Sequence, residues 1–201
     1  MKGDCLTSAL TFPTTNNPFP QTGLKAKLPD IELPPFAVRR DAVAEAVDDR
    51  TPGVILPYIL GIPHPSDAVR KRCREDALLF IEDSCDALGS RYGGKLPGTC
   101  PCIATFSFYA SHHITTCEGG MLIAKNAELS SAVMSFRDWV GTQICRSPGG
   151  APSICRLQWS CQVKLPTDCD LQFVFDHNGF NMKSKDIPDA LAFHNLPVFI
   201  A

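Results

Sequence analysis

Short apolar runs recur along the chain, and segments with helical spacing lie between them. The runs are rich in β-branched and aromatic residues, which favours buried strands at Leu6 to Phe12, Val54 to Leu60, Leu78 to Ile81, Ile103 to Tyr109 and Met121 to Ala124. The intervening segments favour helices at Asp41 to Asp48, Ser66 to Asp76 and Asn126 to Trp139. Alternating strands and helices predict an α/β fold with a mostly parallel sheet and flanking helices.

The periodic pattern ends after Trp139. Glycines and prolines interrupt the stretch from 141 to 170, which we expect to be an irregular, cysteine-containing loop. Ser184 to Leu196 then favours a last helix, provided that Pro188 lies in its first turn. We therefore divide the chain into a central domain at 1–140, the loop at 141–170 and a closing segment at 171–201.

Composition narrows the classes of function. The 201 residues are 44% hydrophobic, which suffices for a packed core, and 19 Lys and Arg against 21 Asp and Glu give a net charge of −2. Such a balance disfavours nucleic-acid binding. The sequence contains no long apolar run and no signal-like start, so we expect a cytoplasmic protein without membrane contact. Its ten cysteines are then reduced thiols or metal ligands.

Candidate functional residues follow two of the expected strands, at the strand ends where α/β sheets bind their ligands. Asp83 follows an apolar run that ends at Ile81, and its carboxylate there calls for a cationic partner such as a protonated heterocyclic nitrogen. The alternative is an N-cap for a following helix. His112 and His113 lie between a strand and the flexible pair Gly119 and Gly120. Ordinary loop histidines are the alternative for this pair.

Three segments point jointly to one family. They read IEDSCDALG at 81–89, TFSFYASHHITT at 105–116 and EGG at 118–120. Together they resemble the DegT family of pyridoxal-phosphate sugar aminotransferases, within it the branch of sugar 3-dehydratases typified by CDP-4-dehydro-6-deoxyglucose 3-dehydratase of lipopolysaccharide dideoxysugar biosynthesis. The resemblance implies part of the large domain of the aspartate-aminotransferase-like fold, known as fold type I.

The resemblance also implies how the chain would hold pyridoxal or pyridoxamine 5′-phosphate. Asp83 matches the residue that pairs with the pyridine nitrogen and keeps it protonated, and Phe12 matches the aromatic that stacks on the ring. Asp86 matches the residue that faces the phenolic oxygen, where relatives more often carry Gln or Glu. Ser107 matches a phosphate contact. Asn181 matches a residue that reaches the phosphate of the partner subunit, which implies a homodimer.

Position 112 separates the reaction types within the family. Aminotransferases carry there a Lys that bonds covalently to the cofactor, which the imidazole of His112 cannot do. The resembling dehydratases hold free pyridoxamine phosphate, and their His removes the 4′-methylene proton before the sugar loses its 3-hydroxyl. An imidazole suits a base that works near neutral pH. The resemblance therefore implies 3-dehydration of a nucleotide-activated 4-keto-6-deoxyhexose, with His112 as the base.

The cysteines bear on a possible second cofactor. Dehydratases for CDP-sugars carry a two-iron two-sulfur cluster that receives electrons from a separate reductase, whereas the GDP-sugar enzyme has no cluster. Cys85, Cys145 and Cys155 match three ligand positions, and Gln143 stands at the fourth. Four thiolates normally hold such a cluster. Either Cys161 or Cys117 replaces the missing ligand, or the site has decayed to free thiols.

Whole relatives extend beyond both ends of the resembling region. Their N-terminal segment includes a helix N-terminus that binds the cofactor phosphate, and a small domain follows their last large-domain helix. We therefore expect a truncated chain that is inactive on its own. The alternatives are a non-catalytic remnant with a metal-binding or interaction role, and a sugar aminotransferase-like protein, which would require a Lys at position 112.

Overall fold

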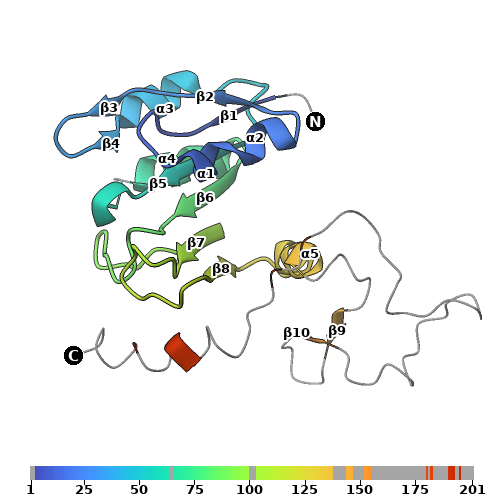
Figure 1. Ribbon diagram of the computed structural model, residues 1–201. Coiled ribbons are helices and arrows are strands. Elements are labelled where there is room, and N and C mark those ends of the chain that lie inside the picture. The colour runs from blue at the N-terminus through green and yellow to red at the C-terminus, as the bar shows by residue number, and fades with distance from the viewer. Residues whose placement is uncertain are drawn as a thin grey trace, which may run out of the picture. The chain divides into compact units, whose positions relative to one another are not determined.

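The computed structural model describes residues 3–63, 66–99, 103–137, 144–146, 152–154, 180, 182, 190–192 and 195. Figure 1 shows the described helices and strands of the chain, which divides into two units. The first comprises Met1–Ala124 with Asp186–Ala201, and the second comprises Lys125–Lys185. The expected last helix falls largely outside the described residues, although 190–192 and 195 are helical.

The first unit is built on a six-stranded sheet with the order β2-β1-β5-β6-β7-β8. Its strands are β1 (Asp4–Leu6), β2 (Lys25–Lys27), β5 (Gly53–Pro57), β6 (Leu79–Asp83), β7 (Ile103–Ser107) and β8 (Gly120–Ala124). All neighbouring pairs are parallel except β7 and β8. The mostly parallel α/β sheet predicted from the sequence is thus confirmed.

The first strand differs from its prediction, because it ends at Leu6 and does not run on to Phe12. The Ser8 hydroxyl accepts a hydrogen bond from the Leu10 backbone N–H at 3.1 Å, which turns the chain away from the sheet. Pro13 then begins the short helix α1 (Pro13–Asn16), with Phe12 extended at its N-cap. The apolar run therefore combines a strand, a turn and a cap. A second short helix, α2 (Pro18–Gln21), follows directly.

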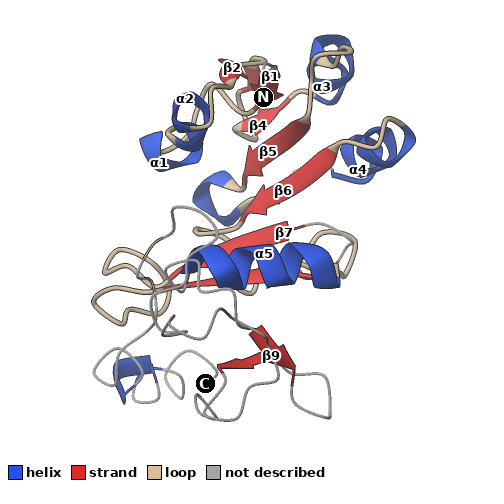
Figure 2. Cartoon of the chain, turned by 90° about the vertical axis from the view of Figure 1, so that its right-hand side faces the viewer, coloured by secondary structure: helices blue, strands red, loops and turns tan. Residues whose placement is uncertain are grey.

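Two helices of the first unit pack against the strands beside them. Helix α3 (Arg40–Ala46) and helix α4 (Ser66–Glu75) agree with the predicted ranges to within two residues. Figure 2 shows α3 and α4 on one side of β5 and β6, whose arrowheads point toward the side of α1. The core between these elements consists of Leu6, Val38, Val43, Val54, Leu56, Val69, Cys73 and Phe80. Burial of this apolar surface is what stabilises the layer.

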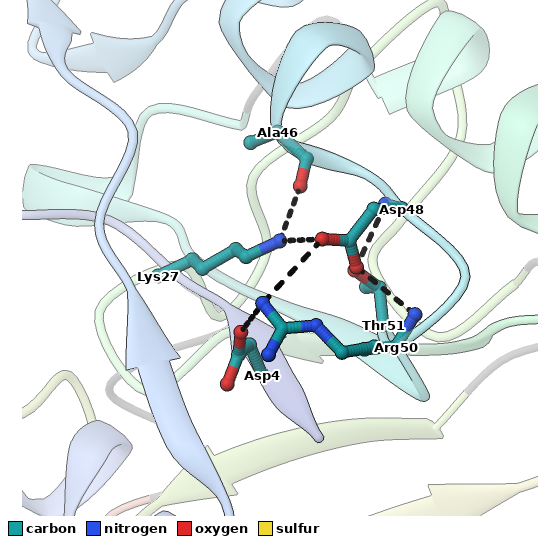
Figure 3. A network of polar contacts seen from close by, with 6 residues as sticks. All are labelled: Asp4, Lys27, Ala46, Asp48, Arg50 and Thr51. Carbon is teal, nitrogen blue, oxygen red and sulfur yellow. Dashed lines mark hydrogen bonds and ion pairs between the residues drawn. The ribbon is translucent and has the colours of Figure 1, made fainter.

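The remaining elements of the first unit are small. Strands β3 (Ile31–Glu32) and β4 (Ala37–Val38) form an antiparallel pair, and a 3₁₀ turn η1 covers Ile59–Gly61. A polar network ties β1 and β2 to the turn after α3 (Figure 3). In it Lys27 Nζ lies 2.6 Å from Asp48, and Arg50 lies 2.8 Å from Asp4.

The second unit contains helix α5 (Ala127–Arg137) and an antiparallel pair, β9 (Ile144–Arg146) and β10 (Pro152–Ile154). Asn126 is the N-cap of α5, because its Oδ1 accepts hydrogen bonds from the backbone N–H groups of Glu128 and Leu129 at 2.7 and 3.2 Å. At the other end of α5, the Phe180 N–H donates to the Phe136 carbonyl at 2.7 Å.

No helix in the described part of the chain has both the length and the apolar composition that a membrane span requires.

Candidate functional site

A cavity of about 570 Å³ lies at the carboxyl ends of the parallel strands. Asp83 is the last residue of β6, Ser107 is the last residue of β7, and α1 follows β1. Parallel pairing places these strand ends at one edge of the sheet, where α/β folds bind ligands. The cavity lining includes five of the six residues predicted to hold the cofactor or act as the base, namely Phe12, Asp83, Asp86, Ser107 and His112.

Neutral donors surround the carboxylate of Asp83. The Thr15 hydroxyl donates to Oδ2 at 2.7 Å, and the Thr105 hydroxyl and the Cys85 backbone N–H lie 3.4 Å from Oδ1. Residues 84–90 form turns, so no helix begins after Asp83. The alternative of a helix N-cap is therefore wrong. Asp83 lines the cavity, and its pairing with a cationic group of a ligand stays a prediction.

The two neighbouring histidines occupy different environments. His112 has a side chain only 18% exposed, and its Nδ1 lies 3.0 Å from Asp86 Oδ1. Because an ionised carboxylate can only accept, Nδ1 carries the proton of this contact and Nε2 is the nitrogen that can take up another. The ring of Tyr109 meets the His112 ring edge-on at 6.3 Å. His113 is exposed, and it is not part of the cavity lining.

Asp86 contacts the histidine, a contact that the sequence did not predict. Its expected position opposite the phenolic oxygen of the cofactor stays a prediction. Its side chain is about half exposed, and the carboxylate that holds Nδ1 fixes both the tautomer and the orientation of the His112 ring. A histidine held by a carboxylate is an arrangement suited to proton transfer.

Phe12 and Ser107 offer two further kinds of contact. The Phe12 side chain is 72% exposed, which leaves an aromatic face for a planar ligand. The Ser107 hydroxyl accepts the Tyr109 N–H at 3.2 Å, so its own hydrogen can be donated to an anionic group. The cavity thus combines an acidic, an aromatic, a basic and a hydrogen-bond-donating side chain.

Of the three cysteines that match ligand positions, Cys85 is the one whose side chain the structure describes; the alternative ligand Cys117 is also described and is exposed. Burial, together with the hydrogen bond to Asp83 and the charge of that carboxylate, raises the pKa of its thiol to about 12. The Cys145 backbone lies on β9, and Cys155, Gln143, Cys161 and Asn181 lie outside the described residues. Among the described side chains, no three His, Cys, Asp or Glu residues are grouped to hold a metal. The iron–sulfur cluster stays a prediction.

Sequence reasoning assigned no role to Thr15 or Tyr58, although both line the cavity. Thr15 lies three residues after Phe12 on the turn of α1, and Tyr58 comes directly after β5. The sequence pattern offered no signal for Tyr58, because this residue lay inside the strand predicted at Val54 to Leu60, whereas β5 ends at Pro57. The Tyr58 N–H donates to the Asp83 carbonyl at 2.9 Å, so this residue also braces the end of β6.

The fold and the cavity together define an α/β domain with a ligand site at the carboxyl edge of a mostly parallel sheet. Its polar groups suit a planar ligand that carries both a cationic and an anionic group. The chain belongs to the DegT/DnrJ/EryC1/StrS aminotransferase family, whose model matches residues 1–147. The family expected from the three sequence segments is thereby confirmed.

Several relatives within the family are sugar 3-dehydratases by name. The chain is 37% identical over 194 residues to the dTDP-4-dehydro-2,6-dideoxy-D-glucose 3-dehydratase of Saccharopolyspora spinosa, with 96% of this chain and 42% of the relative covered. It is 35% identical over 188 residues to the lipopolysaccharide biosynthesis protein RfbH of Salmonella typhimurium, covering 93% of this chain and 43% of that protein. The chain therefore spans less than half the length of these two curated relatives.

The fold agrees with solved structures of the family. The Escherichia coli GDP-4-keto-6-deoxy-D-mannose 3-dehydratase with bound hydrated PLP superposes with a TM-score of 0.81 at 26% identity. The match covers 100% of this chain and 49% of that one. The expected large-domain fold of these enzymes is confirmed.

Proposed function

We propose that this chain is the part of a pyridoxamine-phosphate-dependent sugar-nucleotide 3-dehydratase that holds the cofactor ring and supplies the base. The observation that carries the proposal is the pair of His112 and Asp86, 3.0 Å apart in the cavity that Asp83 also lines. A transaminase of this family would need a Lys at position 112, and the named relatives include 3-dehydratases of dTDP- and GDP-linked sugars.

The residues of the cavity fit pyridoxamine 5′-phosphate. Its volume of about 570 Å³ lies inside the range of roughly 300–1,000 Å³ that small-molecule sites occupy. The Asp83 carboxylate would pair with a protonated pyridine nitrogen, the exposed Phe12 ring would stack on the heterocycle, and the Ser107 hydroxyl would donate to the phosphate. When bound, the cofactor supplies an electron sink next to the substrate carbon.

His112 is the proton acceptor in this proposal. Its Nε2 would take the proton, while Asp86 keeps the proton on Nδ1 and stabilises the imidazolium cation that results. The electron pair left by that proton would expel the sugar 3-hydroxyl, which would leave as water by taking a proton from the His112 imidazolium. The substrate is a nucleotide-activated 4-keto-6-deoxyhexose. Asp86 would hold the base through this contact.

Further elements of the proposal concern partners and a second cofactor. A homodimer would bring Asn181 of one subunit to the cofactor phosphate of the other. Cys85, Cys145 and Cys155 would provide thiolates for a two-iron two-sulfur cluster, which would need a fourth ligand and a separate reductase. Binding of the cofactor ring does not depend on these elements.

The test separates holding the cofactor from accepting the proton. The Asp83→Asn variant should bind pyridoxamine 5′-phosphate about tenfold more weakly, because the pyridinium loses its anionic partner. The His112→Asn variant should keep the wild-type affinity and lose 3-deoxygenation in any preparation that is active. His113→Asn is the matched control, since this neighbouring histidine is exposed.

A second measurement does not depend on activity. After incubation with pyridoxal 5′-phosphate and borohydride reduction, the wild-type chain should carry no pyridoxyl adduct at residues 107–120, whereas His112→Lys should carry one at position 112. A stable adduct in this stretch of the wild-type chain, or equal affinity losses in the Asp83 and His112 variants, would contradict the proposal.

A further inference from the structure

Two threonines extend from the cavity wall to the carboxylate of Asp83. The Thr15 hydroxyl donates to Asp83 Oδ2 at 2.7 Å, and the oxygens of Thr11 and Thr15 lie 2.8 Å apart. Thr15 is only 6% exposed, although it lies on a four-residue helix at the surface of the sheet. Its backbone N–H also donates to the Phe12 carbonyl at 3.1 Å.

The direction of the two hydroxyl hydrogen bonds follows from the number of protons. An ionised carboxylate can only accept, so Thr15 must use its single hydroxyl hydrogen for Asp83. The contact between the two threonines then requires Thr11 to donate to Thr15. Hydrogen bonds aligned in this way polarise one another, so the bond that reaches Asp83 is strengthened.

We propose that Thr15 is a positioning residue that fixes the Asp83 carboxylate relative to the Phe12 ring, and so sets how strongly the site holds a cationic aromatic ring. The proposal rests on the function proposed above. Thr15 reaches Asp83 through its side chain and Phe12 through its backbone, so one residue connects the groups that would contact the nitrogen and the face of the heterocycle.

The other donors to Asp83 are weaker. Thr105 and the Cys85 N–H are both 3.4 Å from Oδ1, where a hydrogen bond is weak, and the Cys85 thiol, which also bonds to Asp83, is a weak donor. The Thr15 contact, in contrast, has the short length of a charge-assisted bond. The torsion that rotates a carboxylate is broad, so one short bond decides its orientation. Removal of the Thr105 hydroxyl should therefore matter less than removal of the Thr15 hydroxyl.

The experiment uses pyridoxamine 5′-phosphate labelled with ¹⁵N at the pyridine nitrogen. Its dissociation constant and the ¹⁵N chemical shift of the bound ring, which reports protonation of that nitrogen, are measured for the full chain and its variants. Thr15→Val keeps the shape and removes the hydroxyl, and it should weaken binding about tenfold and shift the ring toward the neutral form. Thr15→Ser should restore both values.

Three further variants complete the design. Thr105→Val and Thr11→Val should each weaken binding only two- to threefold, because the first removes a long contact and the second only the polarising donor. Thr22→Val removes a hydroxyl that caps α2 by bonding to Pro18, and it should change neither value. If Thr15→Val fails to fold, Thr11→Val decides the question, because loss of the donor that polarises the Thr15 hydroxyl should move the nitrogen shift toward that of the neutral ring.

The outcomes separate this inference from the proposed function. If Asp83→Asn changes the nitrogen shift and Thr15→Val matches Thr22→Val, the role of Thr15 is refuted and the proposed function stands. If Asp83→Asn leaves both the affinity and the shift unchanged, the carboxylate does not contact the ring and both proposals fall. A normal shift in Thr11→Val when Thr15→Val does not fold also refutes the positioning role.

Discussion

The substitution Glu82→Gln tests the buried ion pair beneath the site. Glu82 lies on β6 and is fully buried, and Arg70 of α4 is 6% exposed. Glu82 Oε1 accepts from the Arg70 guanidinium and from the Tyr58 hydroxyl at 2.7 Å, and Oε2 accepts the Gly98 N–H at 2.6 Å. Both carboxylate oxygens are therefore used in joining β6 to its neighbours.

The loss of stability in Glu82→Gln arises from the positive charge of Arg70, which stays buried when the negative charge of Glu82 is removed. The amide has the same shape and can keep one acceptor, but it removes the negative charge beside Arg70. Asp67 lies 3.4 Å from Arg70 and is 71% exposed, so solvent screens its compensation of the buried guanidinium. Breaking a buried pair by removing one partner costs about 3–5 kcal/mol. That is a large fraction of the roughly 5–15 kcal/mol by which domains are stable.

A double-mutant cycle compares the free energy of unfolding, measured in urea, of four proteins: the wild type, Glu82→Gln, Arg70→Met and the double variant. The double variant should be much more stable than the sum of the two single losses predicts, because no buried charge is left alone. Tyr58→Phe is the matched control: it removes a hydrogen bond to a charged group, which costs about 1.5–3 kcal/mol, and leaves the ion pair in place. A loss below about 1 kcal/mol for Glu82→Gln, together with additive single effects, would refute the reasoning.

Two further predictions concern titration. The hydrogen bond from Lys27 holds the pKa of Asp48 at about 2, below its ordinary value of 3.8, so its contribution to stability is present above about pH 4 and is lost as the pH falls toward 2. In Asp48→Asn the melting temperature should therefore fall less steeply between about pH 4 and pH 2 than in the wild type, and high salt should reduce this difference. The same pH dependence of the melting temperature in both proteins would contradict the prediction. Burial raises the pKa of the Cys85 thiol to about 12, so iodoacetamide at pH 8 should alkylate Cys85 far more slowly than the exposed Cys117. Unfolding the chain in urea should remove this difference. Equal alkylation rates in the folded chain would contradict the prediction.

The part of the site that could be predicted follows from parallel strand pairing. Asp83 follows one apolar run and Ser107 lies near the end of another, and parallel strands bring those ends to one edge. Phe12 and His112 required the family resemblance, because an aromatic at a turn and a loop histidine are common features without it. The Asn126 cap could be predicted from local sequence, since its two hydrogen bonds are to residues two and three positions away.

The contacts that could not be predicted join positions far apart in the sequence. Thr15 and Asp83 are separated by 68 positions, and Glu82 and Gly98 by 16. A hydrophobic pattern predicts which face of an element is apolar, but it does not identify the partner of a polar side chain. The predicted length of β1 was wrong for a related reason. The apolar run continues to Phe12, but the chain already turns at Ser8, whose hydroxyl accepts a backbone N–H, and Pro13 then begins a helix.

Adjacent residues of β6 place two carboxylates in opposite electrostatic situations. Side chains alternate between the faces of a strand, so Glu82 and Asp83 point to different sides. Glu82 is neutralised by the buried guanidinium of Arg70, whereas the donors at Asp83 are the neutral groups of Thr15, Thr105 and Cys85. Neutral donors orient a carboxylate and leave its charge uncancelled. A charge that is oriented in this way beside an exposed aromatic ring is suited to a planar cation, and it is this property of Asp83 that connects the fold to the proposed cofactor.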